Sequence, residues 1–261
     1  MAKIFIIVEG ELDKPFIDSV LIKMGLKISF KNNDNEQFET DDRFEIKKSP
    51  ADPNKNKPTT LIKALQQVAN RQFFADKNPV KKVVIIRDLD ENPLSDTLEL
   101  VNNAIKGAYA ASVSDIPEIT KEQEFVTLKF KQNSNDTDDD ATEIQFACYI
   151  IGVYVDNNGV EEKQGETDDI LKKMIINSPN VADCINNHLP NCLNSRNPTA
   201  ILSDKKLTKL WLYNYQRFDD PAYKVANYRF DAQEMMSRGI FDFDKNIREL
   251  NELKDFLNKC I

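Results

Sequence analysis

The chain has little of the chemistry that several enzyme classes require, and histidine is the clearest case. His188 is the only histidine among the 261 residues, so a Ser–His or Cys–His mechanism would have to use it. It lies in residues 186–190, a pattern typical of a helix end and not of the sharp turn that presents a nucleophile. The sequence therefore disfavours a hydrolase of that type.

Cysteine is also scarce, and the chain has no Cys-x-x-Cys pair. The four cysteines are Cys148, Cys184, Cys192 and Cys260. Cys184 and Cys192 flank His188, but their spacing fits no common zinc-binding pattern. We therefore expect reduced thiols in a cytoplasmic protein, without a zinc site.

Long apolar runs, a phosphate-binding loop and an excess of basic residues are absent too. The first apolar run, residues 4–8, ends at Glu9 and is too short for a signal peptide or a membrane span. No Gly-x4-Gly-Lys-Ser/Thr segment occurs, so we expect no ATP binding through a P-loop. The net charge of −8 argues against a generally basic nucleic-acid-binding surface, although it permits a local basic groove. We expect no membrane partner.

The first part of the sequence alternates between strand and helix patterns. Strand patterns lie at 4–8, 43–47 and 82–87, and helical patterns at 12–24, 59–74 and 95–108. Alternation of this kind predicts an α/β fold with a central, mostly parallel sheet flanked by helices. The hydrophobic content of 41% is enough for a substantial core.

The pattern changes after these elements. We predict strands at 124–131 and 143–155, a turn at 156–159, and helices at 167–177, 180–188, 203–217, 231–238 and 245–259. Neither an internal repeat nor a clean linker interrupts the chain. The sequence therefore predicts a single domain over residues 1–261, with an α/β core at 1–177 and a helical extension at 178–261.

Acidic residues follow two of the predicted strands. Glu9 ends the first strand, with Asp13 four residues later, and Asp88 and Asp90 follow the strand at 82–87. The carboxyl edge of a parallel sheet is where ligands bind. If the two strands are neighbours, these four carboxylates converge there and would repel one another unless a hard cation such as Mg²⁺ lies among them.

These motifs resemble those of Toprim domains. Glu9-Gly10-Glu11-Leu12-Asp13 followed by Asp88-Leu89-Asp90 is most similar to the form found in the overcoming-lysogenization-defect family of nucleases. Residues 152–155, 165–171 and 238–244 resemble segments of a small family of uncharacterised prokaryotic Toprim-like proteins. The resemblance implies a Toprim-like, Rossmann-like fold over almost the whole chain.

The resemblance also implies an activity, which is phosphodiester transfer on nucleic acid with Mg²⁺ or Mn²⁺, in defence or DNA repair. Glu9 would be a metal ligand or general acid/base, Asp88 and Asp90 would hold the metal, and Asp13 would support them. In the nuclease group an ATPase is part of the same chain. Because this chain has no P-loop, we expect any ATPase partner to be a separate subunit.

Two later groups could assist this chemistry. Glu166 and Asp168 could complete a second metal site, although acids are also common in the first turn of a helix. The resemblance to the nuclease group implies a late lysine near the scissile phosphate. The candidates are Lys205, Lys206 and Lys209, of which we select Lys206 as catalytic. The other interpretation of these lysines is a solvated helix face, and Arg87 is a further candidate for the cation.

Aromatic and basic residues interleave near the C-terminal end. The aromatic residues are Trp211, Tyr213, Tyr215, Phe218, Tyr223, Tyr228 and Phe230. They could stack on nucleic acid, but they suit a helical core better.

Two rival functions remain open. The first is a Toprim-fold module without activity that binds a partner protein, such as an ATPase, or nucleic acid. The second is a receiver-like phosphoacceptor domain, which also gathers acids at strand ends, but no strand ending in lysine follows at the expected place.

Overall fold

The computed structural model describes most of the chain. The described residues are 3–10, 12–27, 44–50, 58–73, 80–89, 93–110, 113, 115–130, 142–157, 160–177, 179–196, 204–220 and 232–261. The chain divides into two compact units, of which unit 1 comprises Met1–Ile151 and Glu252–Ile261 and unit 2 comprises Gly152–Asn251. This division does not fall near residue 177, and the single-domain description stays a prediction.

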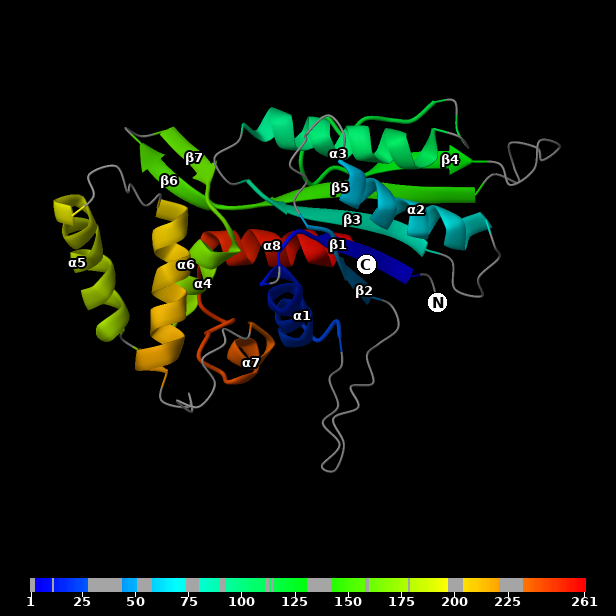
Figure 1. Cartoon of the computed structure of the whole chain (residues 1–261). Helices are drawn as coiled ribbons and strands as arrows, with labels where there is room; N and C mark the ends of the chain where they lie inside the picture. Colours follow the sequence, from blue (N-terminus) through cyan, green and yellow to red (C-terminus); the bar gives the residue numbers. More distant parts are fainter. Residues whose placement is uncertain are drawn as a thin grey trace. The chain divides into compact units, whose positions relative to one another are not determined.

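A five-stranded sheet lies at the centre of unit 1 (Figure 1). Its strands are β1 (Lys3–Val8), β2 (Phe44–Lys48), β3 (Val80–Asp88), β4 (Val126–Phe130) and β5 (Thr142–Ile151). The order across the sheet is β2-β1-β3-β5-β4, and every neighbouring pair is parallel except β4 with β5. The predicted mixed α/β architecture with a mostly parallel sheet is confirmed.

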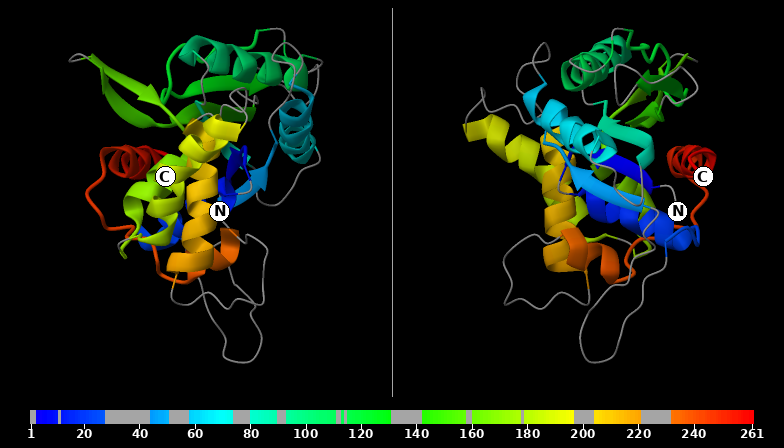
Figure 2. Two further views of the ribbon diagram at one scale, coloured as in Figure 1. Left: turned by 60° about the vertical axis from the view of Figure 1, so that its left-hand side comes forward. Right: turned by 90° about the vertical axis from the view of Figure 1, so that its right-hand side faces the viewer.

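Helices cover both faces of this sheet (Figures 1 and 2). The helices of unit 1 are α1 (Asp13–Lys23), α2 (Thr59–Phe73), α3 (Leu94–Tyr109) and the later part of α8 (Arg248–Lys259). Ile7 and Ile85 from the strands share one buried cluster with Leu61 of α2 and Val101 of α3. On the opposite face, Phe256 of α8 stacks on Tyr149 of β5 with ring centroids 4.9 Å apart.

Tyr109 at the end of α3 has a buried hydroxyl with no hydrogen-bond partner in the described part of the chain. Its ring packs edge-on against Phe146 at 5.5 Å, and burial raises the pKa of the hydroxyl well above its usual value. We expect Tyr109→Phe to leave the free energy of unfolding unchanged or to raise it by about 1 kcal/mol, because an unsatisfied buried donor is costly. Urea unfolding followed by circular dichroism tests this, and a loss above about 1 kcal/mol would contradict it.

Unit 2 contains a hairpin and a group of helices. Its elements are β6 (Val153–Asn157), β7 (Val160–Gln164), α4 (Thr167–Met174), α5 (Val181–Arg196), α6 (Asp204–Asn214), a π-helical turn (Tyr215–Asp219), α7 (Ala232–Ser237) and the start of α8. The sequence did not predict β7, and α5 passes through Pro190 where the prediction ended at His188. Proline inside a helix removes a backbone donor, which is why the pattern indicated an end there.

The aromatic residues of unit 2 divide between core and surface. Trp211 and Tyr215 are fully buried and stack with centroids 5.5 Å apart, as core packing predicts. Phe218 is 51% exposed. Tyr223, Tyr228 and Phe230 lie outside the described residues. No helix in the described ranges is long and apolar enough to cross a membrane.

Candidate functional site

The two strands that end in acidic residues are neighbours in the sheet. β1 and β3 run parallel, and Ile7 pairs with Ile85. Continuing this register by two positions places Glu9 beside Arg87. The predicted convergence of the acids required the two strands to be adjacent and parallel. The structure meets this condition.

Glu9 and Arg87 form an ion pair at this edge. The Nε atom of Arg87 lies 3.0 Å from Oε2 of Glu9, and their side chains are 5% and 14% exposed. The guanidinium and the carboxylate are therefore in direct contact, with little exposure to solvent. Arg87 was expected from the sequence as a candidate partner for phosphate, and its pairing with Glu9 was not predicted.

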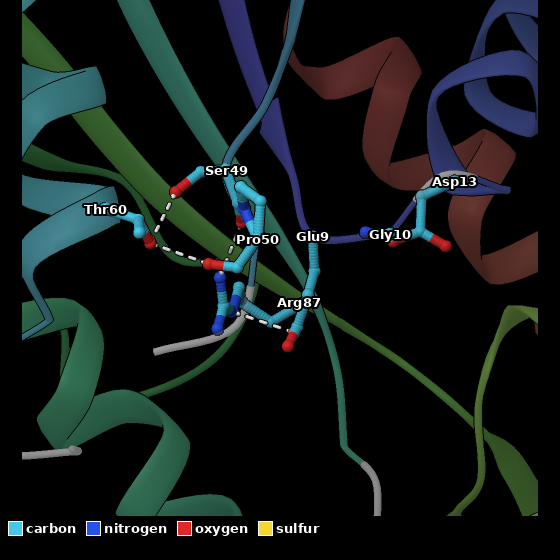
Figure 3. A network of polar contacts seen from close by, with 7 residues as sticks. All are labelled: Glu9, Gly10, Asp13, Ser49, Pro50, Thr60 and Arg87. Carbon is cyan, nitrogen blue, oxygen red and sulfur yellow. Dashed lines mark hydrogen bonds and ion pairs between the residues drawn. The ribbon is translucent and has the colours of Figure 1, made fainter. Parts of the chain in front are cut away.

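A polar network fixes the other end of Arg87 (Figure 3). Its Nη1 donates to the carbonyl of Ser49 at 3.3 Å, and the Ser49 N–H donates to the carbonyl of Val8 at 2.7 Å. Thr60 of α2 donates to the carbonyl of Pro50 at 2.6 Å. Ser49 was not predicted as a member of this edge; it is the residue directly after β2.

Asp13 serves the turn that follows Glu9. The Gly10 N–H donates to Oδ2 of Asp13 at 2.6 Å, and Asp13 is 2% exposed. A Cβ atom on residue 10 would lie 3.2 Å from the same oxygen, so a side chain there would crowd this contact. In Figure 3 the Asp13 carboxylate lies at this turn, whereas the Glu9 carboxylate points toward Arg87. The predicted role of Asp13 as a metal ligand stays a prediction.

Asp88 ends β3 and is half-buried. Side chains alternate between the faces of a strand, and Ile85 and Leu89 belong to the cluster beneath α2 and α3. Asp88 therefore faces the side of the sheet opposite α2 and α3, whereas Glu9 lies on the same face as Arg87. The two acids lie at the same edge of the sheet, but their side chains are on opposite faces.

The remaining member of the predicted acidic group, Asp90, lies outside the described residues. Within the described ranges, no three side chains of the types histidine, cysteine, aspartate and glutamate group closely enough to hold a metal ion. Mg²⁺ is commonly bound by one or two carboxylates together with waters and substrate phosphates. Glu9 and Asp88 supply two carboxylates at one edge, although their side chains lie on opposite faces of the sheet.

Glu166 and Asp168 lie in unit 2 at the start of α4. Glu166 is the N-cap of the helix, and its N–H donates to Oδ2 of Asp169 at 3.0 Å in a reciprocal capping box. The Nζ atom of Lys209 lies 2.9 Å from Glu166 and 3.7 Å from Asp168. Glu166 therefore acts as an acid at a helix start, which is one of its two predicted roles. A second metal would have to compete with Lys209 for the carboxylates of Glu166 and Asp168.

The candidate lysines occupy different positions on α6. Lys206 is exposed, Lys209 pairs with the acids of α4, and the side chain of Lys205 lies outside the described residues. Thr208, between them, donates to Oδ1 of Asp169 at 3.0 Å. Of the two cysteines beside His188, Cys184 is exposed, and the side chain of Cys192 is not among those described.

Comparisons with known proteins cover the whole chain. The family described as "Protein of unknown function (DUF3226)" matches residues 3–261. No curated protein matches. Among solved structures, the chain is similar to the "hypothetical protein PH0156 from Pyrococcus horikoshii OT3", with 15% identity, a TM-score of 0.39, and coverage of 100% of this chain and 95% of that chain. At that identity and TM-score the likeness assigns no function.

Proposed function

The chain belongs to DUF3226, a family of proteins of unknown function, and we propose that it is a metal-dependent nuclease or a related enzyme of phosphodiester transfer. The observation that carries this proposal is the parallel pairing of β1 with β3, which brings Glu9 and Asp88 to one edge of the sheet. Carboxylates after two neighbouring parallel strands are what the Toprim resemblance implies. The proposal includes a Toprim-like fold for the sheet and its helices.

The acids of this edge would hold the cation. Mg²⁺ or Mn²⁺ bound there would supply activation of a water or hydroxyl and stabilisation of the leaving oxygen. Glu9 pairs with Arg87 at 3.0 Å, and a carboxylate at this edge suits a metal ligand or a general base. Asp88 would be a second ligand, and Asp13 and Asp90 are proposed to complete the group.

Unit 2 contributes the other proposed residues. Lys206 is exposed on α6, where its ammonium is accessible to a phosphate in solution. Glu166 and Asp168 are the proposed ligands of a second cation, which would replace the Lys209 ammonium now 2.9 Å from Glu166.

Cleavage of labelled circular DNA, linear DNA and RNA with Mg²⁺ or Mn²⁺ tests this function. We expect Glu9→Gln and Asp88→Asn each to lower the rate by at least about 100-fold, because each removes a charged oxygen from the site. Glu99→Gln is the matched control, since Glu99 is an exposed acid on α3 of the same unit, and it should cleave at the wild-type rate. Circular dichroism must show that all three variants fold.

Two results would contradict the nuclease. One is a wild-type chain that cleaves none of these substrates and is not stabilised by either cation. The other is cleavage that survives both Glu9→Gln and Asp88→Asn.

The alternative function is a module without activity that binds nucleic acid or a partner protein, such as a separate ATPase. Two observations favour it: Arg87 already pairs with Glu9, and Asp88 leaves the edge on the opposite face. For such a module, Glu9→Gln would leave partner capture unchanged, and titration with Mn²⁺ would release no heat.

A further inference from the structure

Contacts within the chain hold the Arg87 guanidinium on two sides. Nε lies 3.0 Å from Glu9, and Nη1 donates to the Ser49 carbonyl at 3.3 Å. The Ser49 N–H donates in turn to the carbonyl of Val8, the residue before Glu9, at 2.7 Å. The contacts therefore form a ring that runs from the end of β1 through Ser49 and Arg87 back to Glu9, and Figure 3 shows its members Glu9, Ser49 and Arg87.

This ring is also attached to α2. Ser49 donates through Oγ to the Thr60 hydroxyl at 3.4 Å, and Thr60 donates to the carbonyl of Pro50 at 2.6 Å. Ser49 is 2% exposed. The carbonyl that accepts from Arg87 thus belongs to a buried residue that contacts both β1 and α2.

Exposure separates the two members of the ion pair. The side chain of Arg87 is 5% exposed, whereas that of Glu9 is 14% exposed. A guanidinium this covered, and already bound on two sides, is poorly placed to reach a phosphate in solution. The carboxylate that it holds is the more accessible group.

We infer that Arg87 is a positioning residue, which fixes the orientation of the Glu9 carboxylate at the edge and does not bind the phosphate itself. This inference rests on the proposed function, because it assigns Arg87 a role in the same site. Metal-ligating carboxylates are usually held by hydrogen bonds from surrounding residues, and loss of such a partner costs about 10- to 100-fold in metal affinity or activity. A carboxylate has two oxygens with several lone pairs, so a contact at Oε2 is compatible with a cation on the same group.

Arg87→Gln and Arg87→Lys test the inference on the full chain. Lysine keeps the positive charge but lacks the planar fork that contacts Glu9 and Ser49 together. We expect both variants to lower the affinity for Mn²⁺, measured by titration calorimetry, by about 10- to 100-fold. The kcat for cleavage should fall together with the affinity for Mn²⁺, and KM for the nucleic acid should stay within about twofold of the wild-type value. Lys81→Gln, which removes an exposed charge near the other end of β3, should match the wild type in every measurement.

Two outcomes would overturn the positioning role while leaving the nuclease intact. If Arg87→Gln binds Mn²⁺ more tightly and Arg87→Lys binds it as the wild type does, Arg87 only competes with the cation for Glu9. If KM rises while the affinity for Mn²⁺ is unchanged, Arg87 binds the phosphate. A wild-type chain that neither binds Mn²⁺ nor cleaves overturns the proposed function first, and this inference with it.

A second comparison covers the case in which the single variants unfold, because they leave Glu9 without the guanidinium. Glu9→Gln/Arg87→Gln removes both charges and is compared with Glu9→Gln alone. Since a positioning residue acts only through Glu9, the two should bind Mn²⁺ equally. A further tenfold loss in the double variant would contradict the inference.

Discussion

Replacement of Arg238 by methionine should destabilise unit 2 by about 3–5 kcal/mol. The Nη1 atom of Arg238 lies 2.7 Å from Oδ2 of Asp220, and the two side chains are 10% and 0% exposed. Removal of one member of a buried ion pair leaves the other charge in a poorly solvated place, which is the reason for a loss of this size. The Asp220 N–H also donates to the carbonyl of Tyr215 at 2.9 Å, so the pair fixes the end of the π-helical turn.

The fluorescence of Trp211 during urea unfolding measures this loss. Trp211 is the single tryptophan of the chain and lies buried in unit 2, so its emission reports that unit. Arg217→Met is the control, since Arg217 is exposed in the same unit, and it should change the free energy of unfolding by less than about 0.5 kcal/mol. Asp220→Leu/Arg238→Met should recover most of the stability, because apolar residues of similar volume can replace a buried pair. A loss below about 1 kcal/mol in Arg238→Met would contradict the expectation.

The strands of unit 1 could be predicted because their residues carry a local signal. The segments at 4–8 and 82–87 are short and rich in β-branched residues, and polar residues bound them. They form β1 and β3. Helix α1 follows the apolar spacing of Phe16, Ile17, Val20 and Leu21, all of which are buried. The β7 strand has a polar sequence, Val-Glu-Glu-Lys-Gln, so no apolar alternation marks it.

The candidate site could be predicted only as far as the strand ends. Glu9 and Asp88 follow apolar runs, and the rule for parallel sheets places them at one edge. The pairing of Glu9 with Arg87 depends on the register between β1 and β3, which connects residues far apart in the sequence. The same register puts the side chain of Asp88 on the face opposite that of Glu9. Two separate sequence motifs could not predict this orientation.

Glu166 in unit 2 shows how one acidic residue serves two purposes. Glu166 was predicted either as a metal ligand or as an acid at a helix start, and it caps α4 while it contacts Lys209. The sequence contains both the cap and the lysine, but their distance of 43 residues along the chain hides the contact. Local signals therefore predicted the helix start, and only the packing of α4 with α6 revealed the ion pair.

Phe256 should be among the most important side chains for the stability of unit 1. It is fully buried, and its ring stacks on Tyr149 at 4.9 Å and on Phe125 at 6.1 Å. The chain end beside it is also fixed, since Lys82 of β3 donates to the carbonyl of Cys260 at 2.7 Å and burial raises the pKa of the Cys260 thiol to about 12. These contacts attach the last turns of α8 to the sheet that carries Glu9 and Asp88.

Phe256→Ala should therefore lower the free energy of unfolding of unit 1 by about 3–5 kcal/mol, because the cavity left by an aromatic ring adds to the lost burial. Hydrogen exchange at the amides of β3 and β5 measures this unit directly, and Trp211 fluorescence reports unit 2 in the same samples. Asp255→Ala, an exposed change one residue earlier, is the control and should leave both readouts within about 0.5 kcal/mol of the wild type. If Phe256→Ala left the exchange of the β5 amides unchanged, α8 would not stabilise the sheet, and residues 252–261 would not belong to unit 1 in solution.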